Sequence, residues 1–429
     1  MSEEASAPGG AAGPARPAAP SRRPRPSRRE LFAVSLGLGV IGFGGGISVL
    51  ATMRDALVAR RRWLTEREFV ATATVAQMLP GGAAANALAY TGLRFHGPAG
   101  AVVAYAAFIA PGAMLVTALA AAYARFGVTP RFEPFLAGMN AAVVGVVAAI
   151  TLQLARAGIG RAWQMGVAAA ALLFALGGTG AGEVAVLGIL AGLVIDLGTK
   201  RFRLVRYRRR GRPPPLALPE EGTPLRPASE LREGSDGAGP GAGLPGAAWL
   251  AVPAALGALA GMAILFARAG LGAYGGGFAV IPSLQATVLG QGWLTPRQFA
   301  DAVTIGKLTP GPVLLMATFV GYLVKGPLGA LVATVAIFSG PLVLVVAVGG
   351  WLSRVRSRRP VRAALRGLTP AVVGLMTAAA LTLGRSLEGP VDLAIAAATL
   401  LTLMRFRPNP AWIMLLGGGI RLGLRLVGV

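Results

Sequence analysis

Lys307 is the residue whose type and position most directly suggest ligand chemistry. It lies in the otherwise apolar stretch 303–324, three residues before Pro310, and it is one of three lysines in the 429-residue chain. A cation inside an apolar segment is costly to bury and is therefore a functional candidate. As a binding group, its ammonium favours an anion. The alternative is a lysine whose head reaches a membrane interface along its alkyl chain.

The segment Pro310-Gly311-Pro312 interrupts the helix expected around it. Pro312 suits the first turn of a new helix, because its missing N–H would be unpaired there anyway. The amides of residues 313–315 would then lack intrahelical acceptors. A helix N-terminus inside a membrane is suited to an anion, because the dipole and the free amides are directed at the ligand.

The same pattern occurs in the first part of the chain. Three segments recur: Gly44-Gly45-Gly46 as Gly275-Gly276-Gly277, Trp63-Leu64-Thr65 as Trp293-Leu294-Thr295, and Pro80-Gly81 as Pro310-Gly311. Gly97-Pro98-Ala99-Gly100 also recurs, as Gly326-Pro327-Leu328-Gly329. Between Trp63 and Gly81, 8 of 19 positions match their counterparts without a gap. The sequence therefore predicts a tandem duplication.

The predicted substrate-binding residues lie at the repeated breaks and beside them. They are Gly44, Gly45, Gly46, Gln77, Pro80, Gly81, Gly82, Asn86, Gly275, Gly276, Gly277, Lys307, Thr309, Pro310, Gly311 and Pro312. Gln77 holds the position equivalent to Lys307 and could donate a hydrogen bond. Asp301, six residues before Lys307, could pair with it or carry a coupling proton. The alternative is that the glycines and prolines only permit close packing or kinks.

Composition places this chemistry in a membrane. The chain is 54% hydrophobic and 14% charged, whereas soluble domains carry about 25% charged residues. Several uncharged runs reach the roughly 20 residues that a membrane helix needs, including 31–53, 97–124, 134–155 and 326–353. The prediction is an all-α polytopic membrane protein. A β-barrel is excluded because its strands alternate in segments of about 10 residues.

Residue usage excludes most enzymes. The chain has no cysteine and a single histidine, His96, so disulfides, thiolate or multi-histidine metal sites and iron–sulfur clusters are ruled out. We expect no metal and no cofactor. Carboxylate chemistry by Asp301 or Glu183 is the one enzymatic alternative. No nucleotide-binding Walker motif is present, so transport would be secondary.

The excess of 41 basic over 17 acidic residues is concentrated between the apolar runs. Arginines cluster in the N-terminal tail and in 200–212, which marks the cytoplasmic side. No basic face interleaved with aromatic residues favours a nucleic-acid partner. The expected units are a disordered basic tail (1–30), a transmembrane repeat (31–198), a cytoplasmic basic linker (199–246) and a second repeat (247–429). The N-terminus and the linker would face the cytoplasm, in the plasma (inner) membrane.

The two halves are predicted to be inverted. The loop before Trp63 is rich in arginine and its counterpart is not, whereas the loop after 353 is rich in arginine and its counterpart at 125–131 is not. A reversal of this bias between equivalent loops indicates opposite insertion; drift of loop charge is the alternative. Apolar pieces of about 13 residues flank the breaks, too short to cross a membrane core of about 30 Å, so re-entrant or discontinuous helices should follow.

At these residues the chain resembles the chromate ion transporter family, in its long form with two homologous halves. The resemblance is strongest over Gly275–Gly277, Gly292–Thr295 and Leu308–Tyr322, and it extends to Phe43–Gly46, Leu79–Gly81 and Asn86. Gly46 and Gly82 stand where the family usually has proline, and Lys307 stands where it often has glutamine.

The resemblance implies efflux of chromate, conferring chromate resistance, with sulfate as a related tetrahedral oxyanion and a possible ion gradient as driving force. The residues independently favour a small anion, because a dianion without an apolar body must be recognised by amides, close backbone approach and a cation. A permease for a different small solute is the alternative. The partners expected are the oxyanion and the lipid bilayer, and the sequence leaves open whether the protein is a homodimer.

Overall fold

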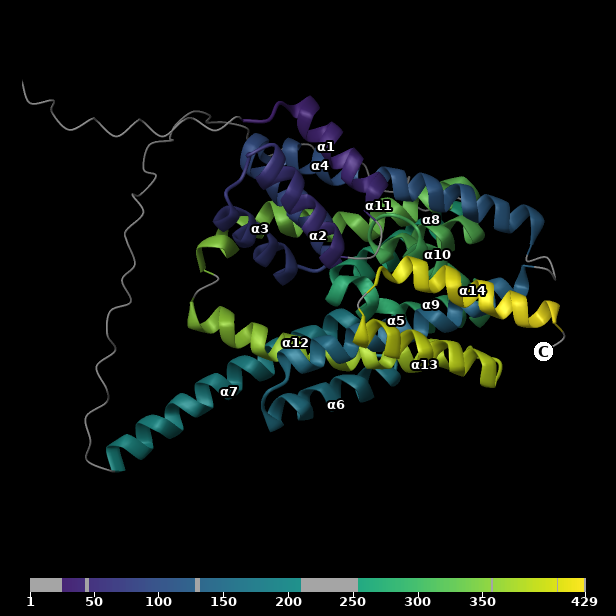
Figure 1. Cartoon of the computed structure of the whole chain (residues 1–429). Coiled ribbons are helices and arrows are strands. Elements are labelled where there is room, and N and C mark those ends of the chain that lie inside the picture. The colour runs from purple at the N-terminus through teal and green to yellow at the C-terminus, as the bar shows by residue number, and fades with distance from the viewer. Residues whose placement is uncertain are drawn as a thin grey trace, which may run out of the picture.

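The computed structural model describes residues 25–42, 46–127, 132–209, 254–355, 358–406 and 408–427, which form helices and turns without a strand. The first half contains α1 (Arg28–Ile41), α2 (Gly46–Arg54), the π-helical η1 (Asp55–Arg60), α3 (Glu66–Met78), α4 (Ala83–Phe126), α5 (Glu133–Gly158), α6 (Ala162–Leu176) and α7 (Ala181–Arg209). The second half contains α8 (Ala254–Leu271), the 3₁₀ turn η3 (Gly275–Val280), α9 (Ile281–Gly290), α10 (Pro296–Leu308), the 3₁₀ turn η4 (Val313–Leu315), α11 (Met316–Val355), α12 (Arg359–Gly384), α13 (Pro390–Arg405) and α14 (Pro410–Leu426). The all-α prediction is confirmed (Figure 1).

Short helices stand on either side of each break, as predicted. Both α3 and α10 have 13 residues, or about 20 Å at 1.5 Å per residue. Each begins with a capping box, formed by Thr65 with Glu68 in α3 and by Thr295 with Gln298 in α10. The threonine hydroxyl accepts from the backbone amide of the residue three positions later, and the side chain of that residue accepts from the threonine amide. Such a box satisfies two of the amides that a helix start leaves unpaired.

In the described part of the chain, four helices are long and apolar enough to cross a membrane, and they fall in the segments 83–126, 133–158, 313–352 and 360–384. Two of them bend at equivalent points. α4 leaves helical geometry at His96 and Gly97, and α11 does so at Lys325 and Gly326. Gly97 and Gly326 have φ values of 64° and 61°, a region that favours glycine. The part before each bend is therefore the return arm of a hairpin, and the part after it is a full span.

The hairpins of the first half open on one face of the molecule. His96 Nε2 lies 2.8 Å from the carbonyl oxygen of Pro26, just before α1. Arg94, at the end of the return arm, pairs with Glu68 at the start of α3. We call this the arginine-rich face, because η1 and the following turn carry Arg60, Arg61 and Arg62 there.

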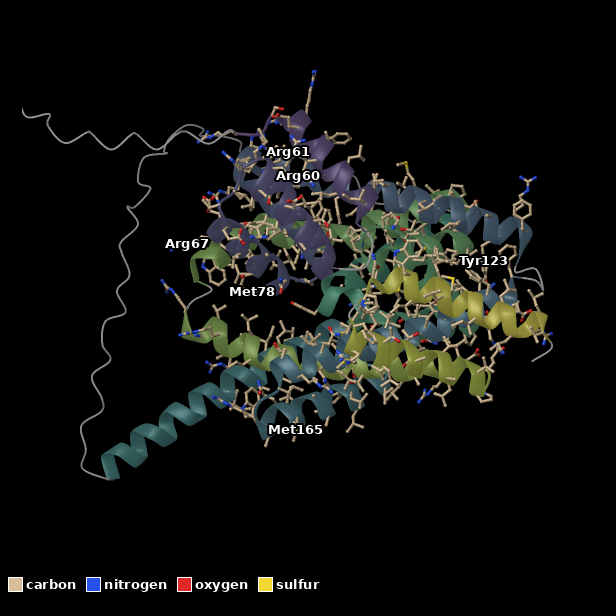
Figure 2. All side chains as sticks on the ribbon, viewed as in Figure 1. Arg60, Arg61, Arg67, Met78, Tyr123 and Met165 are labelled. Atoms are coloured by element: carbon tan, nitrogen blue, oxygen red, sulfur yellow. The ribbon has the colours of Figure 1, made fainter. Side chains whose placement is uncertain are left out.

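The hairpins of the second half open on the opposite face. Tyr123, near the end of α4, donates to Asp301 of α10 at 2.9 Å, and Arg297 of α10 pairs with Glu133 at 2.6 Å. Residues 98–126 extend about 43 Å between the two faces. Figure 2 shows Arg60, Arg61 and Tyr123 at opposite ends of the molecule. The halves are therefore inverted repeats, as predicted.

Helix packing follows the same pseudo-two-fold symmetry. α5 packs against α14 and α13 as α12 packs against α7 and α6, while α4 packs against α1 as α11 packs against α8. The self-equivalent pairs α4–α11 and α5–α12 are also in contact. A Cβ built on Gly138 would lie 2.3 Å from the Gly417 carbonyl, and one built on Gly367 would lie 2.0 Å from the Gly188 carbonyl. Only glycine allows these equivalent helix crossings to be so close.

Some sequence predictions fall on residues outside this description. Residues 1–24 of the expected tail, and 210–253, which include most of the expected linker, lie outside the described residues. The basic segment that begins at Lys200 continues helix α7 as far as Arg209.

Candidate functional site

The break of the second half is a short extended segment between two helices. α10 ends at Leu308, Thr309 and Pro312 are extended, and the 3₁₀ turn that starts at Val313 leads into α11. Gly311 has φ 116°, a conformation that L side chains rarely adopt. The Thr309 hydroxyl donates to the Ile305 carbonyl at 3.0 Å. The Thr309 amide also donates to that carbonyl at 3.0 Å, and the hydroxyl lies 3.3 Å from the Gly306 carbonyl, for which Pro310 has no N–H to offer.

The break of the first half has the same course. α3 ends at Met78, Leu79 and Gly82 are extended, and α4 starts at Ala83. Gly81 has φ 104°. Asn86 Nδ2 donates to the Pro80 carbonyl at 2.8 Å, with longer contacts to two carbonyls at the end of α3. Asn86 therefore holds the break in shape, and its buried Oδ1 has no hydrogen-bond partner among the described residues.

Each break is tied to the other half by a backbone hydrogen bond. The Gly81 amide donates to the Ala273 carbonyl at 2.8 Å, and the Gly311 amide donates to the Gly42 carbonyl at 3.1 Å. Gly42 and Ala273 are equivalent positions, each directly before the aromatic residue that precedes the three glycines. The duplication therefore produces a reciprocal pair of bonds at the centre of the molecule.

The two breaks also touch directly. A Cβ built on Gly82 would lie 3.0 Å from Cβ of Pro312, and one built on Gly112 would lie 2.2 Å from the Pro310 carbonyl. The predicted residues Pro80, Gly81, Gly82, Pro310, Gly311 and Pro312 are thus brought together across the two halves. In this conformation the contact between Gly82 and Pro312 leaves no gap between the breaks at that point.

The glycine run of the second half lies beside its own break. Gly275, Gly276 and Gly277 have φ values of 64°, 77° and 94°, so this turn depends on glycine at all three positions. A Cβ on Gly277 would lie 3.1 Å from Cγ of Leu314, at the start of the helix that follows the break. In the first half, Gly44 and Gly45 lie outside the described residues, and Gly46 begins α2.

Lys307 is buried at the end of α10, with 5% of its surface exposed. Its Nζ lies 5.3 Å from the centre of the Phe278 ring, directly after the glycine run. Within the described part of the chain no carboxylate pairs with this ammonium. A buried cation over an aromatic face without a counter-ion is suited to an incoming anion.

Two polar candidates have surroundings unlike those of Lys307. Gln77, the counterpart of Lys307, is exposed. Asp301 does not pair with Lys307. Its side chain is fully buried and accepts from Tyr123 and from Asn140. The physical reason is helical geometry, because residues six apart on a helix point in different directions.

The sequence reading missed the partners of Asp301. Asn140 Nδ2 donates to Asp301 Oδ1 at 2.8 Å, and Asn140 Oδ1 accepts from the Thr304 hydroxyl. A signal was present, because Ala142-Val143-Val144-Gly145 recurs as Ala371-Val372-Val373-Gly374. That repeat makes Asn140 equivalent to Thr369, so both halves carry a polar residue at this position of an apolar helix.

Backbone amides follow each break. The amides of Val313 and Leu314 have no acceptor among the described residues, whereas the Leu315 amide donates to the Pro312 carbonyl at 3.0 Å. The expectation of three free amides is therefore correct for two. Ala83 and Ala84 are in the same position in the first half. Free amides at a helix start carry partial positive charge.

Comparison with known proteins was made on the whole chain. The family model described as Chromate transporter matches residues 29–197 and 260–422. A chromate transport protein of Cupriavidus metallidurans is 29% identical over 384 residues, 88% of each chain. A probable chromate transport protein of Synechococcus elongatus is 30% identical over 366 residues, 83% of this chain and 84% of the other. No solved structure matches.

Proposed function

Because the chain belongs to the chromate transporter family, whose members are membrane transporters and not enzymes, we propose that it exports chromate by secondary transport across the plasma membrane. Sulfate, a tetrahedral dianion of the same kind, is the second proposed substrate. The buried ammonium of Lys307 carries the proposal, since it lies beside the paired breaks and no carboxylate of the described residues pairs with it.

The proposed binding site is formed by Lys307 and the start of α11. The ammonium supplies a full positive charge, and the free amides of Val313 and Leu314 supply hydrogen-bond donors. Chromate has only oxygen acceptors on its surface, so donors and charge are the whole of its recognition. Glycine at 277 and 311 lets the backbone approach closely. Thr309 and Asn86 hold the breaks in shape and act as positioning residues.

The distribution of charge supports export from the arginine-rich face. Arg60, Arg61 and Arg62 lie there, and such clusters mark the cytoplasmic side. The opposite face presents Arg297 with Glu133 and Glu388, 2.6 and 3.7 Å away. A dianion is therefore drawn towards the arginine-rich face by long-range attraction. The N-terminus of α1 belongs to that face, which supports a cytoplasmic N-terminus.

Asp301 is proposed as the coupling residue. Its carboxylate is fully buried, lies one turn after Arg297 and connects α10 to both α4 and α5. Ionisable groups buried inside a membrane protein commonly mark ion or proton pathways. The equivalent position in the first half is Ala71, so this carboxylate occurs once in the duplicated fold.

Flux into proteoliposomes tests the proposed function. The purified chain is expected to move radiolabelled chromate, with competition by unlabelled sulfate. Lys307→Ala and Gly311→Leu should abolish this flux while the protein still inserts and purifies. Unchanged flux in both variants would exclude the site, and flux of an unrelated small solute without chromate flux would exclude the substrate.

A further inference from the structure

The two halves share repeated sequence segments, but the contacts of their short helices differ. α10 packs against α5, whereas their counterparts α3 and α12 make no comparable contact. The difference is visible in burial. Asp301 and Thr304 of α10 are fully buried, while their counterparts Ala71 and Thr74 of α3 are half-buried and exposed. The pairs of long helices pack alike in the two halves, whereas the short elements do not, since α12 also contacts η3 and α9 of its own half and α5 makes no comparable contact with α2 among the described residues.

The contact between α10 and α5 is polar and lies towards the face opposite the arginine-rich face. Asp301 and Thr304 both bond Asn140 of α5, and Arg297 pairs with Glu133. The bonded residues are 161 to 164 positions apart in the chain. α10 and α5 therefore lie side by side in the same direction, and their contact closes the second half against the first.

The corresponding residues on the arginine-rich face are known from the duplication. Arg297 corresponds to Arg67, because each stands four residues after Trp63 or Trp293. Glu133 corresponds to Arg362, since both lie 12 residues before the glycine of the repeated Ala-Val-Val-Gly segment. Arg67 and Arg362 are both exposed. An attractive pair on one face thus has two cations as its counterpart on the other.

We propose that the described structure is one of two transport states, in which the α10–α5 contact is closed and the α3–α12 contact is open, and that transport exchanges the two. The side of α3 formed by the exposed Arg67 and Thr74 and the half-buried Ala71 would then be covered by α12 of the same chain. This inference rests on the proposed transport function. Inverted repeats make such an exchange possible, because either half can adopt the packing of the other.

The charges make the exchange depend on the anion. In the exchanged state Arg67 would face Arg362, as Arg297 now faces Glu133. Two guanidinium groups repel each other, so the empty arginine-rich side resists closure. A dianion between them offsets this repulsion and accepts bidentate hydrogen bonds from arginine. Arg67 and Arg362 therefore form the proposed entry site for chromate. Because of their repulsion, the α3–α12 contact closes only when the anion is bound.

The absence of cysteine allows a direct test. One double variant carries Asn140→Cys and Thr304→Cys, and the other carries Thr74→Cys and Thr369→Cys, the symmetric pair. Each is treated in proteoliposomes with a short bifunctional thiol reagent, with and without chromate. Without chromate the first pair should cross-link and the second should not. Chromate should raise cross-linking of the second pair severalfold and lower that of the first, and either cross-link should block flux until it is reduced.

A charge variant separates the entry site from the rest. Arg362→Glu places an acid opposite Arg67, so the second pair should cross-link severalfold more without chromate. Arg358→Glu, an equal charge change at the exposed N-cap of α12, is the matched control and should not do so. No cross-linking of the second pair during active flux would overturn the proposal, as would cross-linking of single Thr74→Cys between two copies. If the two contacts exchange without chromate and the protein moves no chromate, only the assignment of chromate as the substrate would be refuted.

Discussion

At the residue scale, the buried cation is the feature that distinguishes the two breaks. Lys307 lies over Phe278 on a helix that is buried throughout its second half, whereas Gln77 at the equivalent position is exposed. The two breaks therefore follow the same backbone course, but the break of the second half has a buried cation beside it and that of the first half an exposed glutamine. In the proposed site a single ammonium neutralises only part of the charge of a dianion, and the free amides after the break supply the remaining donors.

Removing that charge should abolish chromate transport. Lys307→Ala is expected to reduce flux by at least tenfold, about 1.4 kcal/mol of lost stabilisation, because neutral amides remain as the main donors. Lys307→Arg keeps the charge and should retain part of the flux. Lys325→Ala is the matched control, since Lys325 is exposed at the bend of α11, and its flux should equal that of the parent. Equal flux in the Lys307→Ala variant would contradict the assignment.

Glu68 gives a pH dependence at the arginine-rich face. Desolvation opposes its charged form, but hydrogen bonds from the Thr65 amide and from Arg94 prevail and lower its pKa from 4.5 to about 2. A lowered pKa stabilises the fold above pH 4.5, and this contribution is lost as the pH falls towards 2. Thermal unfolding of Glu68→Gln should therefore lie below that of the parent at pH 7, and the two should converge at acid pH. A constant difference would exclude this role.

At the element scale, the breaks depend on backbone conformations that glycine allows. Gly81 and Gly311 combine positive φ with a tie to the other half, through their bonds to Ala273 and Gly42. Gly81 also faces Pro341, to which an added Cβ would approach within 2.7 Å. A side chain at position 81 would therefore cause both backbone strain and a steric clash with Pro341.

Alanine at these glycines should destabilise the fold. Gly81→Ala is expected to lower the free energy of unfolding by about 1–3 kcal/mol, and Gly311→Ala, with φ 116° and Leu315 at 3.0 Å, should behave alike. Gly261→Ala, in α8 with open space around it, is the control and should be neutral or slightly stabilising, because alanine favours a helix. Thermal unfolding in detergent measures all three. Equal unfolding midpoints for the three variants would contradict backbone strain at Gly81 and Gly311.

At the scale of the whole molecule, two inverted halves are joined by contacts that cross the centre. α4 meets α11, α5 meets α12, and each half closes over the break of the other. The open ends of the hairpins of the two halves lie at opposite faces, which Arg61 and Tyr123 mark in Figure 2. Orientation in the membrane follows from which face carries the arginines.

Cysteine labelling tests this orientation. In the cysteine-free chain, Arg61→Cys should react with an impermeant thiol reagent only from the cytoplasmic side, and Phe126→Cys, at the exposed end of α4, only from the outside. Intact cells and inside-out vesicles give the two directions of access, and the unmodified chain is the blank. Labelling of both positions from the same side would contradict the inverted arrangement.

The helices and their interruptions could be predicted from the sequence. Uncharged runs, prolines, glycines and capping threonines act through a few neighbouring residues, so the short helices around Pro80 and Pro310 and the duplication could be predicted. The reversal of arginine between equivalent loops likewise indicated inversion, because loop charge acts during insertion. The family match later confirmed two halves.

Which side chains meet depends on the packing of helices that are far apart in the chain. Asp301 could be seen as an acid in an apolar segment, but its partners Tyr123 and Asn140 lie 178 and 161 positions away. Likewise, nothing local separates Gln77 from Lys307 in burial. The contacts of Asp301 and the burial of Lys307 depend on how one half is rotated against the other. Packing between distant helices sets that rotation, whereas local hydropathy indicates only that a helix is apolar.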